Sequence, residues 1–233
     1  MNIDRRLKNS YEKLANHYEK DVDTKSFNAY YERPAMTRLI GNVNGLKILD
    51  AGCGAGYYME LMINKGAKEV VGIDFSENMV AAAKRRIKDN GKVFLHNLNE
   101  DLPFEDSYFD LIISSLTLHY VKDINKVFRE LSRVLKKDGH IVISIHHPMM
   151  TYLYFQIENY FEEVLLEDRI NGIPVFFYHR PLEMIINAFA KNNLFIERII
   201  EPKPIKKFME QDEKNYKKLM KKPQFILIKG IKK

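Results

Sequence analysis

Ile48-Leu49-Asp50-Ala51-Gly52-Cys53-Gly54-Ala55-Gly56 is an apolar run that meets three glycines on alternate positions. The pattern predicts a β-strand that ends in a tight turn, and residues 57–65 continue with helical spacing. Glycines in such a turn, followed by a helix, let the backbone approach a nucleotide-sized ligand closely. This segment therefore predicts a site for an adenosine-type cofactor.

The chain has 233 residues, of which 45% are hydrophobic. That is enough for one α/β core, so we expect a single domain, 1–233. No apolar leader is visible at the N-terminus, and no run approaches the roughly 18 apolar residues of a membrane span. We therefore expect a soluble, cytoplasmic protein without membrane contact. Cys53 is the only cysteine, which excludes intrachain disulfides and cysteine metal clusters.

Strand-like and helix-like segments alternate after the glycine motif, which predicts βαβ crossovers and a mostly parallel sheet. Strands are expected at 69–74, 92–96, 109–114, 140–145, 194–200 and 224–230, and helices at 76–88, 124–135 and 182–193. Ser76 is the expected N-cap of the first of these helices.

The pattern divides the domain into four parts. Residues 1–42 are helical in pattern, and 43–146 form the cofactor-binding core. Residues 147–180 are an insertion with two strands, 160–168 and 173–178, around an Asn-Gly turn, which predicts a hairpin covering the substrate. Residues 181–233 complete the sheet.

The glycine spacing argues against a nicotinamide cofactor. A dinucleotide fold carries G-x-G-x-x-G, whereas the third glycine here comes one residue early. Asp50 also stands at a strand position that dehydrogenases keep apolar. Asp74 ends the next strand about 20 residues further on, where a carboxylate can accept both hydroxyls of an unphosphorylated ribose.

Four segments resemble the successive motifs of class I S-adenosylmethionine-dependent methyltransferases. They are ILDAGCGAGYY (48–58), VVGIDFSENMVAAAKRR (70–86), NLNEDLPFEDSYFDLIISSLTLHYV (97–121) and ELSRVLKKDGHIVIS (130–144). The resemblance spans about 45–200 and implies a Rossmann-like three-layer α/β sandwich. Its sheet would have seven mostly parallel strands, with the last strand antiparallel.

The resemblance also implies the cofactor and its contacts. Asp50 would orient the ammonium of S-adenosylmethionine, Asp74 would hold the ribose, and S-adenosylhomocysteine would be the product. The remaining cofactor residues implied are Tyr18, Arg33, Gly52, Cys53, Gly54, Gly56, Phe75, Met79, Asn97, Leu98, Ser114 and Leu116.

Several of these residues have an alternative structural interpretation. Met79 also fits a helix core, and Asn97 also fits a loop cap. Arg33 would pair with the cofactor carboxylate, or with Glu32 or Asp23 in a surface ion pair. The resemblance implies that residues 1–42 form a helical lid over the site. The rings of Tyr11 and Tyr18 in this lid would face the sulfonium or simply pack against the sheet.

Three histidines are candidates for a catalytic base: His119, His146 and His147. All follow predicted strands, on the side of the sheet where ligands of parallel sheets bind. A base is needed only where the methyl acceptor must lose a proton. Adjacent residues in a strand point to opposite faces, so His146 and His147 would not share an ion, and no metal is expected.

Three functions remain open, and we expect first a methyltransferase that acts on a small molecule by in-line displacement. An RNA methyltransferase is the second, because residues 202–233 hold eleven lysines against three acidic residues. Apolar residues recur there at helical spacing, which favours a solvated helix face over nucleic acid. A non-catalytic protein that binds S-adenosylmethionine is the third. The acceptor and the oligomeric state are not determined by the sequence.

Overall fold

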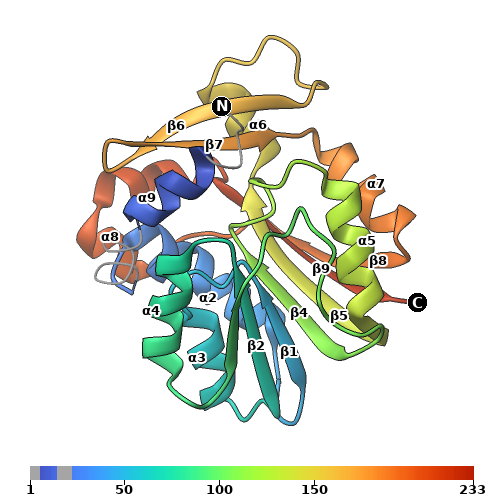
Figure 1. The fold of residues 1–233 in the computed structure, drawn as a ribbon. Helices are drawn as coiled ribbons and strands as arrows, with labels where there is room; N and C mark the ends of the chain where they lie inside the picture. The colour runs from blue at the N-terminus through green and yellow to red at the C-terminus, as the bar shows by residue number, and fades with distance from the viewer. Residues whose placement is uncertain (1–5, 15–22) are drawn as a thin grey trace.

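Seven strands form the central sheet of the computed structural model, which describes residues 6–14 and 23–233 (Figure 1). The strand order is β3-β2-β1-β4-β5-β9-β8, and within this sheet only β9 runs antiparallel to its neighbours. The strands are β1 (Lys47–Ala51), β2 (Glu69–Asp74), β3 (Lys92–Leu95), β4 (Phe109–Ser115), β5 (Leu135–His146), β8 (Leu194–Ile200) and β9 (Phe225–Lys232). The seven-stranded, mostly parallel sheet expected from the sequence is therefore confirmed.

Helices cover both faces of this sheet and make the three-layer sandwich that was expected. One face packs against α5 (Ile124–Val134) and α7 (Leu182–Lys191), and the other against α2 (Arg33–Ile40), α3 (Tyr57–Asn64) and α4 (Glu77–Ile87). The π-helix η1 (Asn28–Glu32) leads directly into α2, and residues 6–14 are helical.

Local sequence sets the ends of these helices. The Ser76 hydroxyl accepts a hydrogen bond from the Met79 amide at 3.2 Å, as expected of an N-cap. Asp123 does the same for α5 through the Lys126 amide. Ser76 places the start of α4 directly after β2, whereas Asp123 starts α5 after the loop that follows β4.

The insertion forms a separate two-stranded sheet above that end (Figure 1). Strands β6 (Val164–Ile170) and β7 (Ile173–His179) pair antiparallel around Asn171 and Gly172, both of which have positive φ. The predicted hairpin is confirmed. Its first strand begins four residues later than predicted, because Asn159 instead holds a turn through the Phe161 amide. The short helix α6 (Pro148–Tyr154) precedes it and was not predicted.

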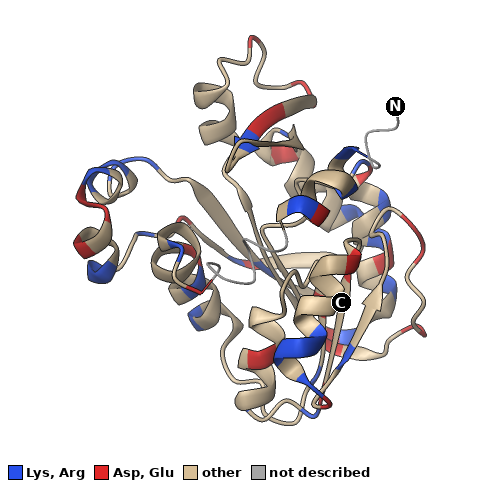
Figure 2. Ribbon diagram, turned by 60° about the vertical axis from the view of Figure 1, so that its left-hand side comes forward, with Lys and Arg blue, Asp and Glu red and all other residues tan. Residues whose placement is uncertain are grey.

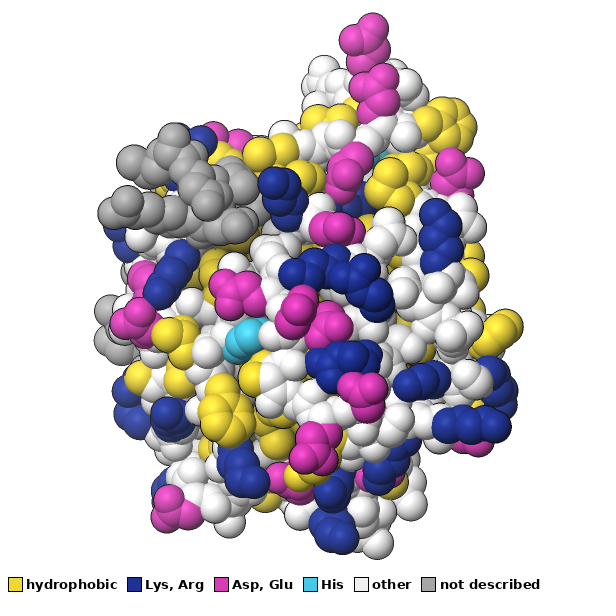
Figure 3. Space-filling view, turned by 45° about the vertical axis from the view of Figure 1, so that its right-hand side comes forward, with side chains coloured by type: hydrophobic (Ala, Val, Ile, Leu, Met, Phe, Trp, Pro, Cys, Tyr) yellow, Lys and Arg dark blue, Asp and Glu magenta, His cyan; other side chains and the backbone are white. Residues whose placement is uncertain are grey.

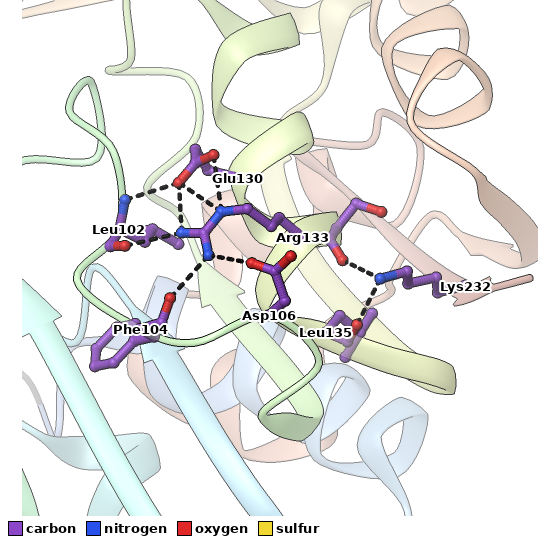
Figure 4. A network of polar contacts seen from close by, with 8 residues as sticks. Leu102, Phe104, Asp106, Glu130, Arg133, Leu135 and Lys232 are labelled. Atoms are coloured by element: carbon purple, nitrogen blue, oxygen red, sulfur yellow. Dashed lines mark hydrogen bonds and ion pairs between the residues drawn. The ribbon is translucent and has the colours of Figure 1, made fainter.

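A partly buried ion pair fixes the loop between β3 and β4 against α5 (Figure 4). Arg133 donates to the carbonyls of Leu102 and Phe104 at 2.8 Å and pairs with Glu130 and Asp106. Glu130 in turn accepts from the Leu102 amide at 2.9 Å. These contacts hold in place a loop whose first residues border the cavity described below.

The lysine-rich segment folds as two short helices, α8 (Lys206–Gln211) and α9 (Glu213–Leu219). Asp212 separates them and caps α9 through the Asn215 amide. Phe208 and Leu219 are buried, whereas the lysines of α8 and α9 are exposed; Figure 2 marks Lys and Arg in blue along the ribbon. Acidic and basic side chains are interspersed on the face that Figure 3 presents. No helix among the described residues is long and apolar enough to cross a membrane.

Candidate functional site

The turn after β1 brings the backbone against the loop that follows β4. Gly52 has φ +82°, and a Cβ there would lie 2.3 Å from the Thr117 side chain. Gly54 has φ +52°, and a Cβ there would meet no atom within 4 Å. The close approach requires glycine at position 52, whereas the backbone at Gly54 leaves open space.

A cavity of about 470 Å³ begins at this turn and lies at the carboxyl ends of β1, β2, β4 and β5. In open parallel sheets this is where ligands bind. Of the residues expected at the cofactor, the cavity wall contains Arg33, Asp50, Gly52, Cys53, Gly54, Asp74, Phe75, Met79, Asn97, Leu98 and Leu116.

Asp50 is a buried acid whose charge the protein leaves uncompensated. Its side chain is 2% exposed, and among the described residues Oδ2 has no hydrogen-bond partner. Burial raises the pKa of the carboxyl to about 8, and the neighbouring Asp74 and Glu32 add to the effect. A buried acceptor without a donor in a cavity wall fits a cationic ligand group, as an amino acid ammonium would supply.

Asp74 lies at the end of β2 and holds the glycine turn. One carboxylate oxygen accepts from the Gly54 amide at 2.9 Å and the other from the Ser76 amide at 3.0 Å. Burial raises its pKa to about 6, partly offset by these two hydrogen bonds. Carboxylate oxygens have further lone pairs, so both can still accept from ribose hydroxyls.

Apolar side chains border the cavity beyond Asp74. Met79 and Leu98 are buried there, and the rings of Tyr11 and Phe75 lie 5.6 Å apart between centroids. Asn97 also borders the cavity, but its side-chain oxygen accepts from the Asn99 amide at 3.0 Å. The loop cap expected as its alternative role is therefore present.

The ion pair between Arg33 and Asp23, one of the expected alternatives, is present, but the Arg33 side chain is buried rather than on the surface. Its guanidinium lies 3.4 Å from the centroid of the Tyr57 ring and 3.6 Å from a carboxylate oxygen of Asp23. It still borders the cavity, so a ligand carboxylate can reach it.

Three other cofactor assignments are not placed in the cavity wall. Ser114 lies inside β4, because this strand extends to residue 115, and its hydroxyl donates to the Ala51 carbonyl at 2.7 Å. Gly56 packs against α4, where its Cβ would lie 3.1 Å from the Cα of Ala83. Tyr18 lies outside the described residues.

Comparison with known proteins agrees with this geometry. A family model described as a methyltransferase domain matches residues 49–143. A demethylmenaquinone methyltransferase of Bacillus pumilus is 32% identical over 66% of this chain and 71% of its own. An uncharacterized protein of Haemophilus influenzae is 28% identical over 89% of both chains.

The solved structure of a putative S-adenosylmethionine-dependent methyltransferase from Listeria monocytogenes superposes with a TM-score of 0.79. It is 27% identical and covers 87% of this chain and 96% of its own. The chain belongs to the class I S-adenosylmethionine-dependent methyltransferases. The buried, unpartnered oxygen of Asp50 and the cavity beside Asp74 fit S-adenosylmethionine, which is the cofactor of this methyltransferase.

Among the three candidate histidines of the methyltransferase, the cavity wall contains His146. The rings of His119 and His146 stack at 4.0 Å between centroids, with His119 behind, at a smaller chamber. Burial lowers the pKa of His146 to about 4 and that of His119 well below its usual range. Both rings are therefore neutral at physiological pH.

His147 does not reach the cavity of the methyltransferase, which removes it as a candidate base. Its Nδ1 accepts from the Met149 amide at 3.1 Å and caps α6, while Nε2 lies 2.9 Å from Glu201. Strand β5 ends at His146, but the backbone of His147 is still extended, so the two neighbouring side chains point to opposite sides.

Sequence reasoning did not identify Glu32 as a buried group of the methyltransferase. It appeared only as an ion-pair partner for Arg33, yet its side chain is 0% exposed and accepts three side-chain hydrogen bonds. Its partners are distributed over the chain, so no local motif marks it. A glutamate between aromatic residues and an arginine in a helical pattern was the available signal.

Proposed function

We propose that the enzyme transfers the methyl group of S-adenosylmethionine to a small, largely apolar molecule by in-line displacement. The observation that carries the proposal is the shape of the cavity, which continues past Ser115 and Leu116 to an aromatic wall. This wall comes from the insertion and from β9, and the cofactor residues lie at the opposite end.

The aromatic wall is built from side chains that alternate along β7. Val175 and Phe177 are each 1% exposed and border the cavity, and Phe155 packs on Phe177 at 5.5 Å between ring centroids. Phe225 of β9 borders it as well. Such a surface favours an apolar or aromatic ring over a charged polymer.

The cofactor supplies an electrophilic methyl group on a sulfonium, and the protein holds the cofactor and the acceptor in the orientation that the transfer requires. Asp50 and Asp74 bind its ammonium and ribose, which fixes the direction from which an acceptor can attack. The aromatic wall excludes water from that path, and alignment of this kind supplies much of the acceleration. Neutral His146 accepts a hydrogen bond from an acceptor hydroxyl or amine. With its pKa of about 4, it orients such a group better than it removes the proton.

A small-molecule acceptor is also supported by the relative from Bacillus pumilus, which is named for demethylmenaquinone. The lysines of α8 and α9 support the alternative of an RNA acceptor only through their charge. The cavity wall contains one of the α9 lysines, Lys218, at its edge with Tyr154.

The test is transfer of labelled methyl groups from S-adenosylmethionine into fractions of a cell extract. We expect label in the low-molecular-weight and solvent-extractable fractions. Label that is confined to RNA or protein would contradict the proposal, and label in RNA would establish the alternative.

Phe177→Ala sharpens this experiment. We expect kcat/KM for the small acceptor to fall at least tenfold, while the Kd of S-adenosylmethionine changes less than threefold. Phe176→Ala is the matched control, because Phe176 points to the other side of β7 and packs under Arg6. Equal losses in both variants would argue against an acceptor site at this wall.

A further inference from the structure

Glu32 is a buried carboxylate placed directly behind the cavity wall. One oxygen accepts from the hydroxyls of Ser115 and Ser144 at 2.9 and 2.6 Å, and the other accepts from the Tyr58 hydroxyl at 2.8 Å. Ser115 and Tyr58 themselves border the cavity. One layer of side chains therefore separates Glu32 from the ligand space.

The surroundings of Glu32 favour its ionised form only in part. Burial raises its pKa, whereas the three hydroxyl donors and neighbouring Arg33 lower it. The guanidinium of Arg33 is directed to Tyr57 and Asp23. A carboxylate held in this way gains most from a cation that arrives with a ligand.

Acidic side chains gather at this end of the cavity. Asp50 and Asp74 are buried in its wall, and the charge of Glu32 contributes to the raised pKa of Asp50. S-adenosylmethionine carries two positive groups, its ammonium and its sulfonium. The ammonium and the ribose are shared with the product S-adenosylhomocysteine, but the sulfonium is not, because methyl transfer converts it to a neutral thioether.

Glu32 is bonded to the part of the chain that lies where methyl transfer is expected. Ser115 ends β4, and Ser144 accepts from the Leu116 amide at 3.1 Å while it donates to Glu32. Leu116 has φ +49° and borders the cavity. The Glu32 carboxylate thus positions the backbone at Leu116 through the hydroxyls of Ser115 and Ser144. Its charge also acts on the neighbouring ligand space, because the interior contains little water to screen it.

We propose that Glu32 is a specificity-determining residue that favours the sulfonium of S-adenosylmethionine over the neutral thioether of S-adenosylhomocysteine. Its charge stabilises the bound substrate cofactor and contributes nothing comparable to the product. After transfer, Glu32 loses the counter-charge that the sulfonium supplied and keeps only that of Arg33, which promotes release of the product. The inference concerns the cofactor alone, so it does not depend on the identity of the acceptor.

The test compares Glu32→Gln with the wild type by isothermal titration calorimetry with S-adenosylmethionine and with S-adenosylhomocysteine. Glutamine keeps the size of the side chain and an acceptor oxygen but removes the charge. We expect the Kd of S-adenosylmethionine to rise about tenfold relative to that of S-adenosylhomocysteine, as loss of one nearby buried charge predicts. A purely structural residue would weaken both ligands equally, and that result, or no change in either Kd, would overturn the proposal.

Two matched variants separate charge from hydrogen bonding. Ser144→Ala removes one donor and leaves the carboxylate, so the ratio of the two Kd values should stay within twofold of the wild type. Asp50→Asn removes a charge beside the shared ammonium, so both ligands should weaken together. A change in the ratio for Asp50→Asn as large as that for Glu32→Gln would contradict a specific role of Glu32.

The wild type alone gives a second measurement if Glu32→Gln does not fold. The ratio of the Kd of S-adenosylhomocysteine to that of S-adenosylmethionine should increase as the pH rises, because the Glu32 carboxyl, whose pKa burial raises, gains its charge with increasing pH. Titration of Asp50 and Asp74 cancels in this ratio because both ligands share the groups they bind, and the other groups that face Glu32, Arg33 and Tyr58, are likewise common to both complexes. A ratio that is constant with pH would contradict the inference.

Discussion

The two ends of the cavity contain opposite kinds of buried polar group. At the turn after β1, burial raises the pKa of Asp50 to about 8 and that of Asp74 to about 6. At the other end, next to the insertion, burial lowers the pKa of His146 to about 4. Desolvation acts on both ends, but the acids regain their charge when a cation arrives, while the imidazole stays neutral. The comparison indicates that the end at Asp50 and Asp74 binds its ligand by charge, whereas the aromatic end next to the insertion binds by complementary shape.

Asp74→Ala should produce the largest effect at the charged end. The variant loses two acceptor oxygens for the ribose and the anchor of the Gly54 amide. We expect the Kd of S-adenosylmethionine to rise about 100-fold, as the loss of two charge-assisted hydrogen bonds predicts. Calorimetry measures the Kd, and circular dichroism should show an unchanged fold. Asp74→Asn keeps one acceptor and should lose less, and an affinity like that of the wild type in Asp74→Ala would contradict the assignment of the ribose.

Arg180→Ala should affect the shape-dependent end instead. Arg180 is 4% exposed, donates to the carbonyls of Val121 and Lys122 at 2.6 and 3.0 Å, and pairs with Glu163. Its loss leaves buried carbonyls without a donor, so the free energy of unfolding should fall by about 3 kcal/mol. Urea denaturation measures this change.

Arg169→Ala is the control for this prediction, because Arg169 is an exposed residue at the tip of the hairpin. It should change the free energy of unfolding by less than about 0.5 kcal/mol. In Arg180→Ala the Kd of S-adenosylmethionine should change less than threefold. A loss of cofactor affinity as large as that of Asp74→Ala would contradict the conclusion that the two ends of the cavity bind their ligands separately.

The pH should act on the charged end in a defined direction. Asp50 is protonated in the ligand-free protein below pH 8, and S-adenosylmethionine binds the ionised form. The affinity should therefore fall by up to about tenfold per unit as the pH decreases from 8 to 7. Because the folded pKa is raised, the ligand-free protein loses stability as the pH rises through about 8, and the cofactor-bound protein does not.

Thermal denaturation with and without S-adenosylmethionine checks this prediction. The increase in Tm caused by the cofactor should grow from pH 6 to pH 8.5 in the wild type, because binding then requires no loss of a proton. Asp50→Asn should flatten that dependence. An increase in Tm that shrinks with pH would contradict the assignment of Asp50.

His147→Ala should have the smallest effect, although it neighbours a residue of the cavity wall. Loss of the α6 cap should lower the free energy of unfolding by about 1 kcal/mol. The kcat for the acceptor should stay within twofold of the wild type, whereas His146→Ala should lower it more strongly. A larger loss of kcat in His147→Ala would return that residue to the catalytic candidates.

Prediction from the sequence succeeded where structure depends on neighbouring residues. The glycine turn, the Ser76 cap and the Asn171-Gly172 hairpin each depend on a few consecutive residues whose conformational preferences are strong. The seven strands and the antiparallel last strand followed from the family resemblance, since a pattern of elements does not by itself pair strands distant in sequence.

The remaining features depend on contacts between distant parts of the chain. The partners of Glu32 come from α3, β4 and β5, so its burial appears only after folding. Helix α6 has only seven residues, and it is held by the His147 cap and by a contact of 2.6 Å between Thr151 and His179. Short helices are marginal without such support, so composition alone did not predict this one.

The antiparallel strand β9 has a consequence for synthesis of the chain. It lies between β5 and β8, and every residue of β5 from His140 to His146 pairs with it. While the ribosome is still making the residues after β8, that edge of β5 has no partner, and β8 has no strand on which to dock. An open apolar edge of this kind promotes association between chains. Slow translation through α8 and α9 would prolong this exposure and favour aggregation of the nascent protein.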